Sequence, residues 1–264
     1  MAASLASTLC GIPVSNLFGL ASAPRTQTYD QLRRARNAGF GFAECKTIPD
    51  QPTPDLSSRY AFSPDEKTME NIEVVYAGDP DGFLRDISVV TAEDESWVVG
   101  MSLMARYDQD IWRRHVEKCV WGTGVTGIDP KRGTGVKFIA VNVSCPHGLK
   151  NRGMGKAMGL VPEIVADVVR WTQEVVGNMP ILVKLTPNGD LDLIVEVART
   201  ACKLGAHITA ANTMNGVVEF DHSVFPPPPH ARGAVPYQWA GGIQDHDRRY
   251  IWRSGTLSQR RDLR

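Results

Sequence analysis

Short apolar runs alternate with segments of helical periodicity along most of the chain. The runs are apolar almost throughout, which is typical of strands buried on both faces of a parallel sheet. Strands that alternate with helices predict an α/β fold in which helical crossovers connect parallel strands. Predicted strands span residues 18–22, 40–47, 97–104, 136–144, 181–186 and 206–212, and predicted helices span residues 29–37, 108–121, 162–176 and 191–204. A long polar, proline-bearing loop is expected between residues 48 and 70.

Polar side chains gather at the carboxyl ends of these predicted strands. In a (β/α)8 barrel those ends converge on one face, where the chemistry of such enzymes takes place. Lysines and asparagines in apolar strands are costly to bury unless they have partners, so the pattern favours a site over chance. The polar residues at these ends are Ser22, Lys46, Asn142, Ser144, Cys145, Lys184, Asn212 and Thr213.

Composition narrows the class of protein. The 264 residues are 42% hydrophobic and carry 29 basic and 29 acidic side chains, as expected of a globular chain with a large core. A zero net charge offers no electrostatic footprint for nucleic acid or an anionic membrane. There is no apolar run long enough for a transmembrane helix, and the N-terminus lacks the basic start of a signal peptide. The five scattered cysteines form no C-x-x-C pair, which disfavours a metal site and suits a reducing cytoplasm.

The glycine-rich stretch GTGVTG at residues 122–127 matches the dinucleotide-binding pattern G-x-G-x-x-G. That pattern requires a strand before it and a helix after it. Here a predicted helix precedes it and Pro130 follows it. We therefore interpret the stretch as a flexible insertion that binds no dinucleotide.

Six segments together resemble the FMN-containing, pyrimidine-reducing domain of the dihydropyrimidine dehydrogenases, within the class 1 dihydroorotate dehydrogenase superfamily. The most specific is the loop that begins SCPHG, because class 1 dihydroorotate dehydrogenases usually carry asparagine where His147 stands. The resemblance implies a (β/α)8 TIM barrel of the dihydroorotate dehydrogenase type that binds FMN. It also implies reduction of the C5–C6 double bond of uracil or thymine. The segments are NLFGLASAP (16–24), GFGFAECKT (39–47), NIEVV (71–75), VNVSCPHGLKNRGMG (141–155), VKLTPN (183–188) and AANTMNG (210–216).

The resemblance also gives roles to individual residues. Cys145 is expected to donate the proton to C5 of the pyrimidine, a role suited to a thiol whose pKa lies near the working pH. The residues expected at the FMN are Ala21, Ser22, Lys46, Thr47, Asn142 and Lys184. Those expected at the pyrimidine are Asn71, Glu73, Ser144, Asn212 and Thr213. The amide groups of the two asparagines suit the alternating C=O and N–H groups of the pyrimidine edge. No metal ligand is expected.

After residue 216 the resemblance fades. We expect residues 1–218 to form a partial FMN-binding barrel with about six of eight strands, because too few residues remain to complete it. We expect residues 219–264 to form a divergent, Pro/Arg-rich tail that is poorly ordered. Electrons would come from an external donor, and a homodimer is a possible assembly. Two alternatives stay open: a class 1 dihydroorotate dehydrogenase, and a non-catalytic fragment that holds no FMN.

Overall fold

A computed structural model describes most of the chain. The described residues are 4–52, 61–65, 68–71, 75–144, 158–214, 249–253 and 256–260. The chain divides into two compact units. The first comprises Met1–Pro54 and Val75–Asn212, and the second comprises Asp55–Val74 and Thr213–Arg264.

The first unit is built on a parallel sheet whose strands follow one another in chain order. Every neighbouring pair is parallel, and the short β5 (Ile48–Pro49) also pairs with β8. Sequential parallel order is the topology of a barrel rather than of a doubly wound sheet, so these strands form half of a (β/α)8 barrel. The six predicted strands are confirmed as β3 (Gly19–Leu20), β4 (Phe42–Glu44), β8 (Val98–Met104), β9 (Phe138–Asn142), β10 (Ile181–Lys184) and β11 (His207–Thr209).

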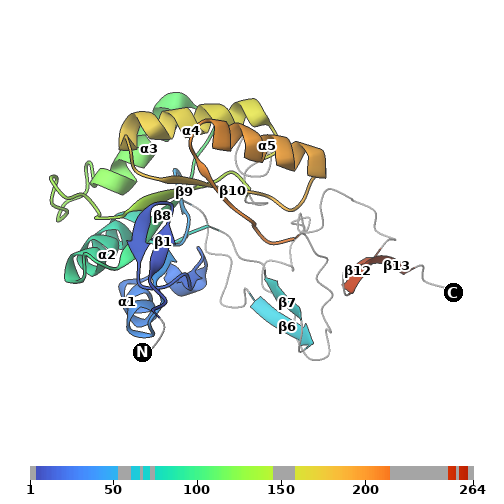
Figure 1. Cartoon of the computed structure of the whole chain (residues 1–264), viewed down its shortest axis with the longest axis horizontal. Helices are drawn as coiled ribbons and strands as arrows, with labels where there is room; N and C mark the ends of the chain where they lie inside the picture. The colour runs from blue at the N-terminus through green and yellow to red at the C-terminus, as the bar shows by residue number, and fades with distance from the viewer. Residues whose placement is uncertain are drawn as a thin grey trace. The chain divides into compact units, whose positions relative to one another are not determined.

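Helices cover one face of this sheet, as Figure 1 shows for the α3, α4 and α5 layer. Helix α1 also packs on α2, α3 on α4, and α4 on α5. Aspartate side chains cap the first turns of α2, α3 and α5, and the side chain of Thr28 caps α1. The four predicted helices are confirmed as α1 (Tyr29–Asn37), α3 (Gln109–Trp121), α4 (Pro162–Val176) and α5 (Leu191–Lys203), and a 3-10 turn covers Pro24–Thr26.

Helix α2 (Pro80–Glu93) was not predicted. Its sequence contains Gly82 and a run of β-branched residues, which weaken helix propensity. Its first turn nevertheless carries a strong signal. Asp79 accepts hydrogen bonds from the backbone N–H groups of Asp81 and Gly82, and Pro80 stands at the first helical position. Burial of one face of the helix in the core then outweighs its weak propensity.

An antiparallel hairpin of β1 (Ser7–Leu9) and β2 (Ile12–Val14) precedes the sheet, where no element was predicted. Its two-residue turn, Cys10–Gly11, has positive φ at both positions (51° and 83°), as a type I′ turn requires. Val14 is buried against the sheet face opposite to the helices. That contact surface comprises Phe42, Val98, Phe138, Ala140 and Leu182, so the hairpin covers the interior of the half-barrel.

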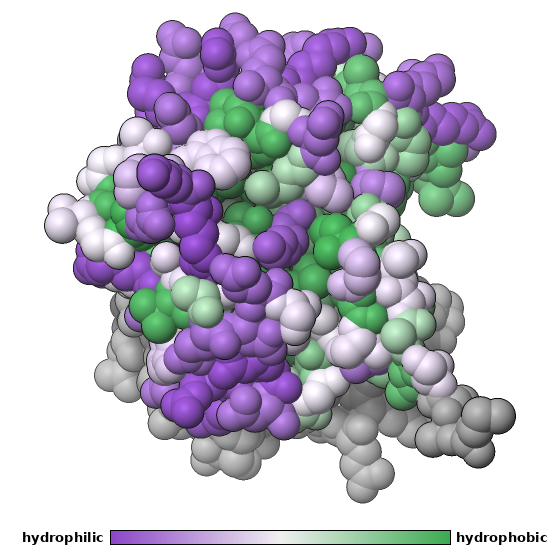
Figure 2. Space-filling view, turned by 60° about the vertical axis from the view of Figure 1, so that its left-hand side comes forward, coloured by the Kyte–Doolittle hydropathy of each residue, from purple (hydrophilic) through white to green (hydrophobic). Residues whose placement is uncertain are grey.

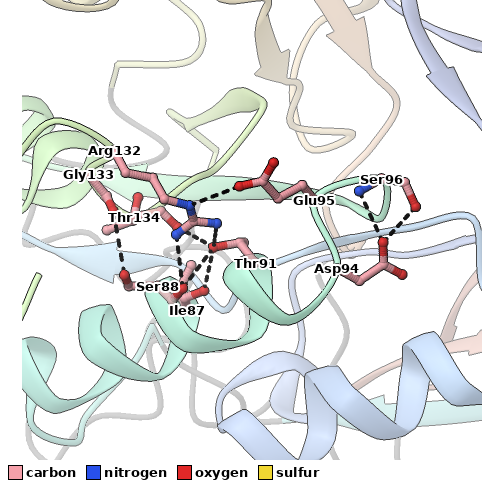
Figure 3. Close-up of polar contacts among 9 residues, drawn as sticks. All are labelled: Ile87, Ser88, Thr91, Asp94, Glu95, Ser96, Arg132, Gly133 and Thr134. Carbon is pink, nitrogen blue, oxygen red and sulfur yellow. Dashed lines mark hydrogen bonds and ion pairs between the residues drawn. The ribbon is translucent and has the colours of Figure 1, made fainter. Parts of the chain in front are cut away.

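The loop after α3 is better anchored than we expected of a flexible insertion. Gly122 ends α3 in the left-handed conformation, and Val125 and Ile128 are buried in the core. Figure 3 shows Arg132 reaching across to α2, where its guanidinium donates to the hydroxyl of Thr91 over 2.9 Å. The same hydroxyl lies 2.7 Å from the carbonyl oxygen of Thr134 and donates to it. The glycines therefore serve turns and the end of a helix.

The described parts of the second unit are two antiparallel hairpins. One joins β6 (Ala61–Asp65) to β7 (Thr68–Asn71), and the other joins β12 (Arg249–Arg253) to β13 (Thr256–Arg260). The expectation of a loop up to residue 70 was therefore wrong, because β6 and β7 pair within that segment. These strands carry several charged residues and pair only within their own hairpins, so the hydrophobic pattern did not reveal them.

Hydrophilic side chains cover much of the face shown in Figure 2, and hydrophobic ones lie between them in separate areas. Among the described residues, no helix is long and apolar enough to cross a membrane.

Candidate active site at the carboxyl ends of the strands

The interior face of the half-barrel changes from apolar to polar along each strand. Its apolar layer is the surface that the hairpin covers, and Gly100 leaves room there for the ring of Phe138. Side chains on one face of a strand recur every second residue, so the next interior positions lie nearer the carboxyl ends. Those positions are polar and buried: Glu44, Ser102, Asn142 and Lys184. The polar residues that the sequence analysis grouped together thus form a polar layer in the barrel interior, next to the apolar layer and nearer the carboxyl ends of the strands.

Thr47 is the centre of a hydrogen-bond chain in this layer. Its hydroxyl lies 3.1 Å from that of Ser22 and 2.8 Å from that of Ser102. It also accepts a hydrogen bond of 3.0 Å from Nδ2 of Asn142. One hydroxyl can donate one hydrogen bond and accept two, so Thr47 uses its whole capacity. It joins Ser22, which follows β3, to Ser102 inside β8 and to Asn142 at the end of β9.

The chain continues from Asn142 to the last strand. The backbone N–H and the hydroxyl of Ser144 lie 3.3 Å and 3.2 Å from Oδ1 of Asn142, and both donate to it. Nδ2 of Asn212 donates to the hydroxyl of Ser144 over 3.1 Å. An unbroken run of hydrogen bonds therefore leads from Ser22, after β3, to Asn212, after β11.

Two lysines belong to the same region. Lys184 ends β10 with 7% of its surface exposed, and its ammonium group makes no hydrogen bond or ion pair with any residue that the structure describes. Lys46 is 4% exposed, and its backbone N–H donates to the carbonyl oxygen of Thr26. The charge of Lys184 acts on the nearby carboxyl group of Glu44, and its ammonium group can also interact with a ligand that has a negative or electron-rich edge.

Glu44 is a buried carboxyl group in this layer that sequence reasoning missed. Burial raises the pKa of Glu44, while the charge of Lys184 and hydrogen bonds from the Ser102 hydroxyl and the Ser22 backbone N–H oppose the rise. Its Oε1 atom is buried and has no hydrogen-bond partner among the residues that the structure describes. Ser102, the polar residue inside the run WVVGMSLM, was also missed. The available signal was the same for both, a polar residue inside an apolar strand.

The structure brings together many of the predicted site residues. Ser22, Thr47, Asn142, Ser144 and Asn212 share the hydrogen-bond chain, and Lys46 and Lys184 lie at the ends of β4 and β10. Ala21 is exposed beside Ser22.

The other predicted residues are not placed at this layer. Thr213 is exposed and belongs to the second unit, where Asn71 also ends β7. Glu73 and Cys145 lie outside the described residues, as does the rest of the SCPHG loop. The described site therefore has cations and amides, which can bind and orient a ligand, while the expected proton donor stays a prediction.

Comparison with known proteins gives this arrangement a family context. No protein-family model matches the chain. The chloroplastic dihydropyrimidine dehydrogenase (NADP(+)) of Arabidopsis thaliana is 26% identical over 250 residues, which cover 90% of this chain and 54% of that protein. The NAD-dependent dihydropyrimidine dehydrogenase subunit PreA of Escherichia coli K12 is 27% identical over 226 residues, covering 82% and 50%. Dihydroorotate dehydrogenase A (fumarate) of Limosilactobacillus reuteri is 43% identical over 84 residues, covering 31% and 26%.

The chain spans about half the length of the two dihydropyrimidine dehydrogenases that it matches. Both alignments extend over at least 82% of this chain, whereas the dihydroorotate dehydrogenase alignment covers under a third of it. The sequential parallel strands of the first unit agree with the barrel expected from the resemblance. The chain is thus a distant homologue of the dihydropyrimidine dehydrogenases, built on part of a TIM barrel.

Proposed function

We propose that this protein is an FMN-dependent oxidoreductase that reduces the C5–C6 double bond of uracil or thymine. One observation supports the proposal most strongly. The buried ammonium group of Lys184, which has no hydrogen-bond or ion-pair partner in the described structure, lies beside a continuous chain of hydroxyl and amide groups. Distant homology to dihydropyrimidine dehydrogenases supports the choice of reaction.

The residues of the polar layer fit the ring system of a flavin. Lys184 would face the edge of the ring on which negative charge develops when the flavin is reduced, and a fixed cation stabilises that charge. Lys46, Thr47 and Asn142 would contact the ring, with Ala21 and Ser22 contributing partly through their backbone. When bound, FMN supplies the hydride; the protein holds the ring and the pyrimidine in register and excludes water.

The pyrimidine would lie against the amide groups. Asn212 and Asn71 would pair with its alternating carbonyl and N–H groups, with Ser144, Thr213 and Glu73 as further contacts. Asn212 already donates to Ser144, so its amide is oriented before substrate arrives. Cys145, the residue that follows Ser144 in the sequence, would donate a proton to C5 of the pyrimidine.

An external electron donor is part of the proposal, because the relatives' names include NAD and NADP while this chain covers only about half of each. The name of one relative is that of a subunit, which supports assembly with other chains. A homodimer and a cytoplasmic location are further proposals, the latter supported by scattered cysteines without a C-x-x-C pair. The partial FMN domain at residues 1–218 and the poorly ordered tail also stay predictions.

The experiment is a half-reaction with the purified chain. We expect a yellow protein whose flavin, reduced anaerobically with dithionite, is reoxidised by uracil or thymine. Cys145→Ala is expected to keep the flavin spectrum and lose at least 100-fold in the rate of reoxidation, because the proton donor is removed. The matched control is Cys202→Ala, which changes an exposed cysteine on α5. Retention of the full rate in Cys145→Ala would exclude that residue as the donor.

A second function has its own supporting observation. The 43% identity to a dihydroorotate dehydrogenase over 84 residues exceeds the identity to either dihydropyrimidine dehydrogenase. The same reduced protein distinguishes the two, because orotate would reoxidise a dihydroorotate dehydrogenase. A colourless protein that takes up no FMN would instead be the non-catalytic fragment.

A further inference from the structure

We propose that Glu44 takes up one proton when the flavin is reduced, so that the net charge of Glu44 and Lys184 together follows the oxidation state of the cofactor. The inference rests on the proposed function and deepens it. It gives a role to a carboxyl group that neither the hydrogen-bond chain nor the expected substrate contacts use.

The first argument is the position of Glu44. It ends β4, where it is paired in register with Gly100 of β8. It is buried, and within the described part of the chain its Oε1 atom has no hydrogen-bond partner. A carboxylate with an unpaired buried oxygen is unstable in a protein interior, and protonation converts it into a neutral group. A change in its surroundings can therefore shift Glu44 between its charged and its protonated form.

The second argument is the set of groups that face Glu44. The charged group that acts on it is the ammonium of Lys184, from β10. Strands β3 and β8 contribute the backbone N–H of Ser22 and the hydroxyl of Ser102, which carry no charge. On β4 itself, Lys46 stands two residues further on, and burial together with Glu44 raises the pKa of the neighbouring Cys45, keeping that thiol protonated. Lys184 thus provides the main electrostatic influence on the carboxyl group.

The third argument is competition for that cation. With oxidised flavin, Lys184 has one anionic neighbour, Glu44, and stabilises its charged form. Reduction places a second negative charge beside the same ammonium group, and two anions in a poorly screened interior repel each other. Proton uptake by Glu44 removes the repulsion. The step balances: FMN gains two electrons and one proton from the reductant and solvent to give the anionic reduced flavin, and the carboxylate gains one further proton from solvent.

The test is the pH dependence of the flavin's two-electron midpoint potential in the holoprotein, measured between pH 5.5 and 8.5. One pH unit is a tenfold change in proton concentration, and tenfold corresponds to 29.6 mV for a two-electron couple. Over the range where Glu44 titrates, we expect the wild-type slope to be steeper than that of Glu44→Gln by up to about 30 mV per pH unit. The matched control, Glu117→Gln, removes the same charge from the exposed face of α3 and is expected to keep the wild-type slope.

A second variant covers the case in which Glu44→Gln does not fold. Ser102→Ala keeps the carboxyl group but removes a hydrogen bond to its charged form, so the steep range is expected to move to higher pH. The inference would be overturned by equal slopes in wild type and Glu44→Gln, or by a steep pH range that does not move in Ser102→Ala. FMN binding in the same preparations would still support the proposed cofactor. A preparation that takes up no FMN would overturn both.

Discussion

The hydroxyl of Thr47 and the amide of Asn142 are joined by a hydrogen bond of 3.0 Å, although the two residues are 95 positions apart in the chain. This bond ties the end of β4 to the end of β9, beside Lys46. The polar layer therefore depends on contacts between strands, and single side chains in it have effects that reach several strands.

Thr47→Val removes the hydroxyl that Ser22, Ser102 and Asn142 share. We expect the free energy of unfolding to fall by about 1–3 kcal/mol, because buried polar groups lose their partner. We also expect FMN to bind at least tenfold more weakly, because Asn142 loses its orientation. Urea unfolding and a flavin fluorescence titration measure the two effects. An unchanged affinity for FMN would show that the hydrogen-bond chain does not shape the cofactor site.

Thr91→Val is the matched comparison, since Thr91 and Thr47 are each 3% exposed. Thr91 anchors the loop before β9, which leads into the amino end of that strand, away from the carboxyl-end layer. Its loss is expected to lower the free energy of unfolding by about 1–3 kcal/mol as well. The affinity for FMN should stay within twofold of wild type. A large loss of FMN affinity in Thr91→Val would contradict the proposal that the FMN site is confined to the carboxyl ends of the strands.

Lys184→Met separates binding from stability. Methionine keeps an unbranched side chain one atom shorter than lysine and removes a charge that makes no hydrogen bond in the described structure. We expect FMN to bind at least tenfold more weakly. The FMN-free protein should be no less stable than wild type, because Glu44 can take up a proton once its cation is lost.

Lys203→Met, at the exposed end of α5, is the control for both measurements on Lys184→Met. It should leave the affinity for FMN unchanged. If Lys184→Met bound FMN as tightly as this control, the cation would have no role at the ligand.

His115 gives stability a specific pH dependence. Burial lowers the pKa of His115, although the Ile48 carbonyl oxygen, 3.0 Å from Nε2, and the charge of Asp50 oppose this. The unfolded state therefore binds more protons than the folded state below pH about 6.5, and stability falls as the pH falls through that range.

The pH effect is read from urea unfolding between pH 7.5 and 5. His115→Gln is expected to lose less stability over this interval than wild type does. His207→Gln, which changes an exposed histidine on β11, should follow the wild-type profile. Parallel profiles for His115→Gln and wild type would contradict the assignment.

Hydrophobic pattern alone predicted the six strands of the sheet and four of its helices, because buried parallel strands and amphipathic helices have distinct periodicities. It failed for α2, where β-branched residues resemble a strand or loop and tertiary burial decides the outcome. It failed for the first hairpin because Cys10 adopts a positive φ that its residue type does not suggest.

The site residues that were predicted lie near the carboxyl ends of the predicted strands, whereas Glu44 and Ser102 lie inside the predicted strands 40–47 and 97–104 and were missed. Lys184 and Asn142 interrupt the pattern at a strand end. Glu44 and Ser102 require knowledge of which face of β4 and β8 points inward, and that is decided by the pairing of strands distant in the chain.

The hairpin of β1 and β2 has a consequence for synthesis of the protein. It leaves the ribosome well before β10, yet Val14 belongs to the buried cluster that includes Leu182 of β10. Until β10 is made, the apolar side of the hairpin stays partly exposed to water. Exposed apolar surface makes a domain prone to aggregation while it is being synthesised. The hairpin thus completes its burial only after β10 has emerged, so a translational pause between the two would prolong the interval in which its apolar side is exposed.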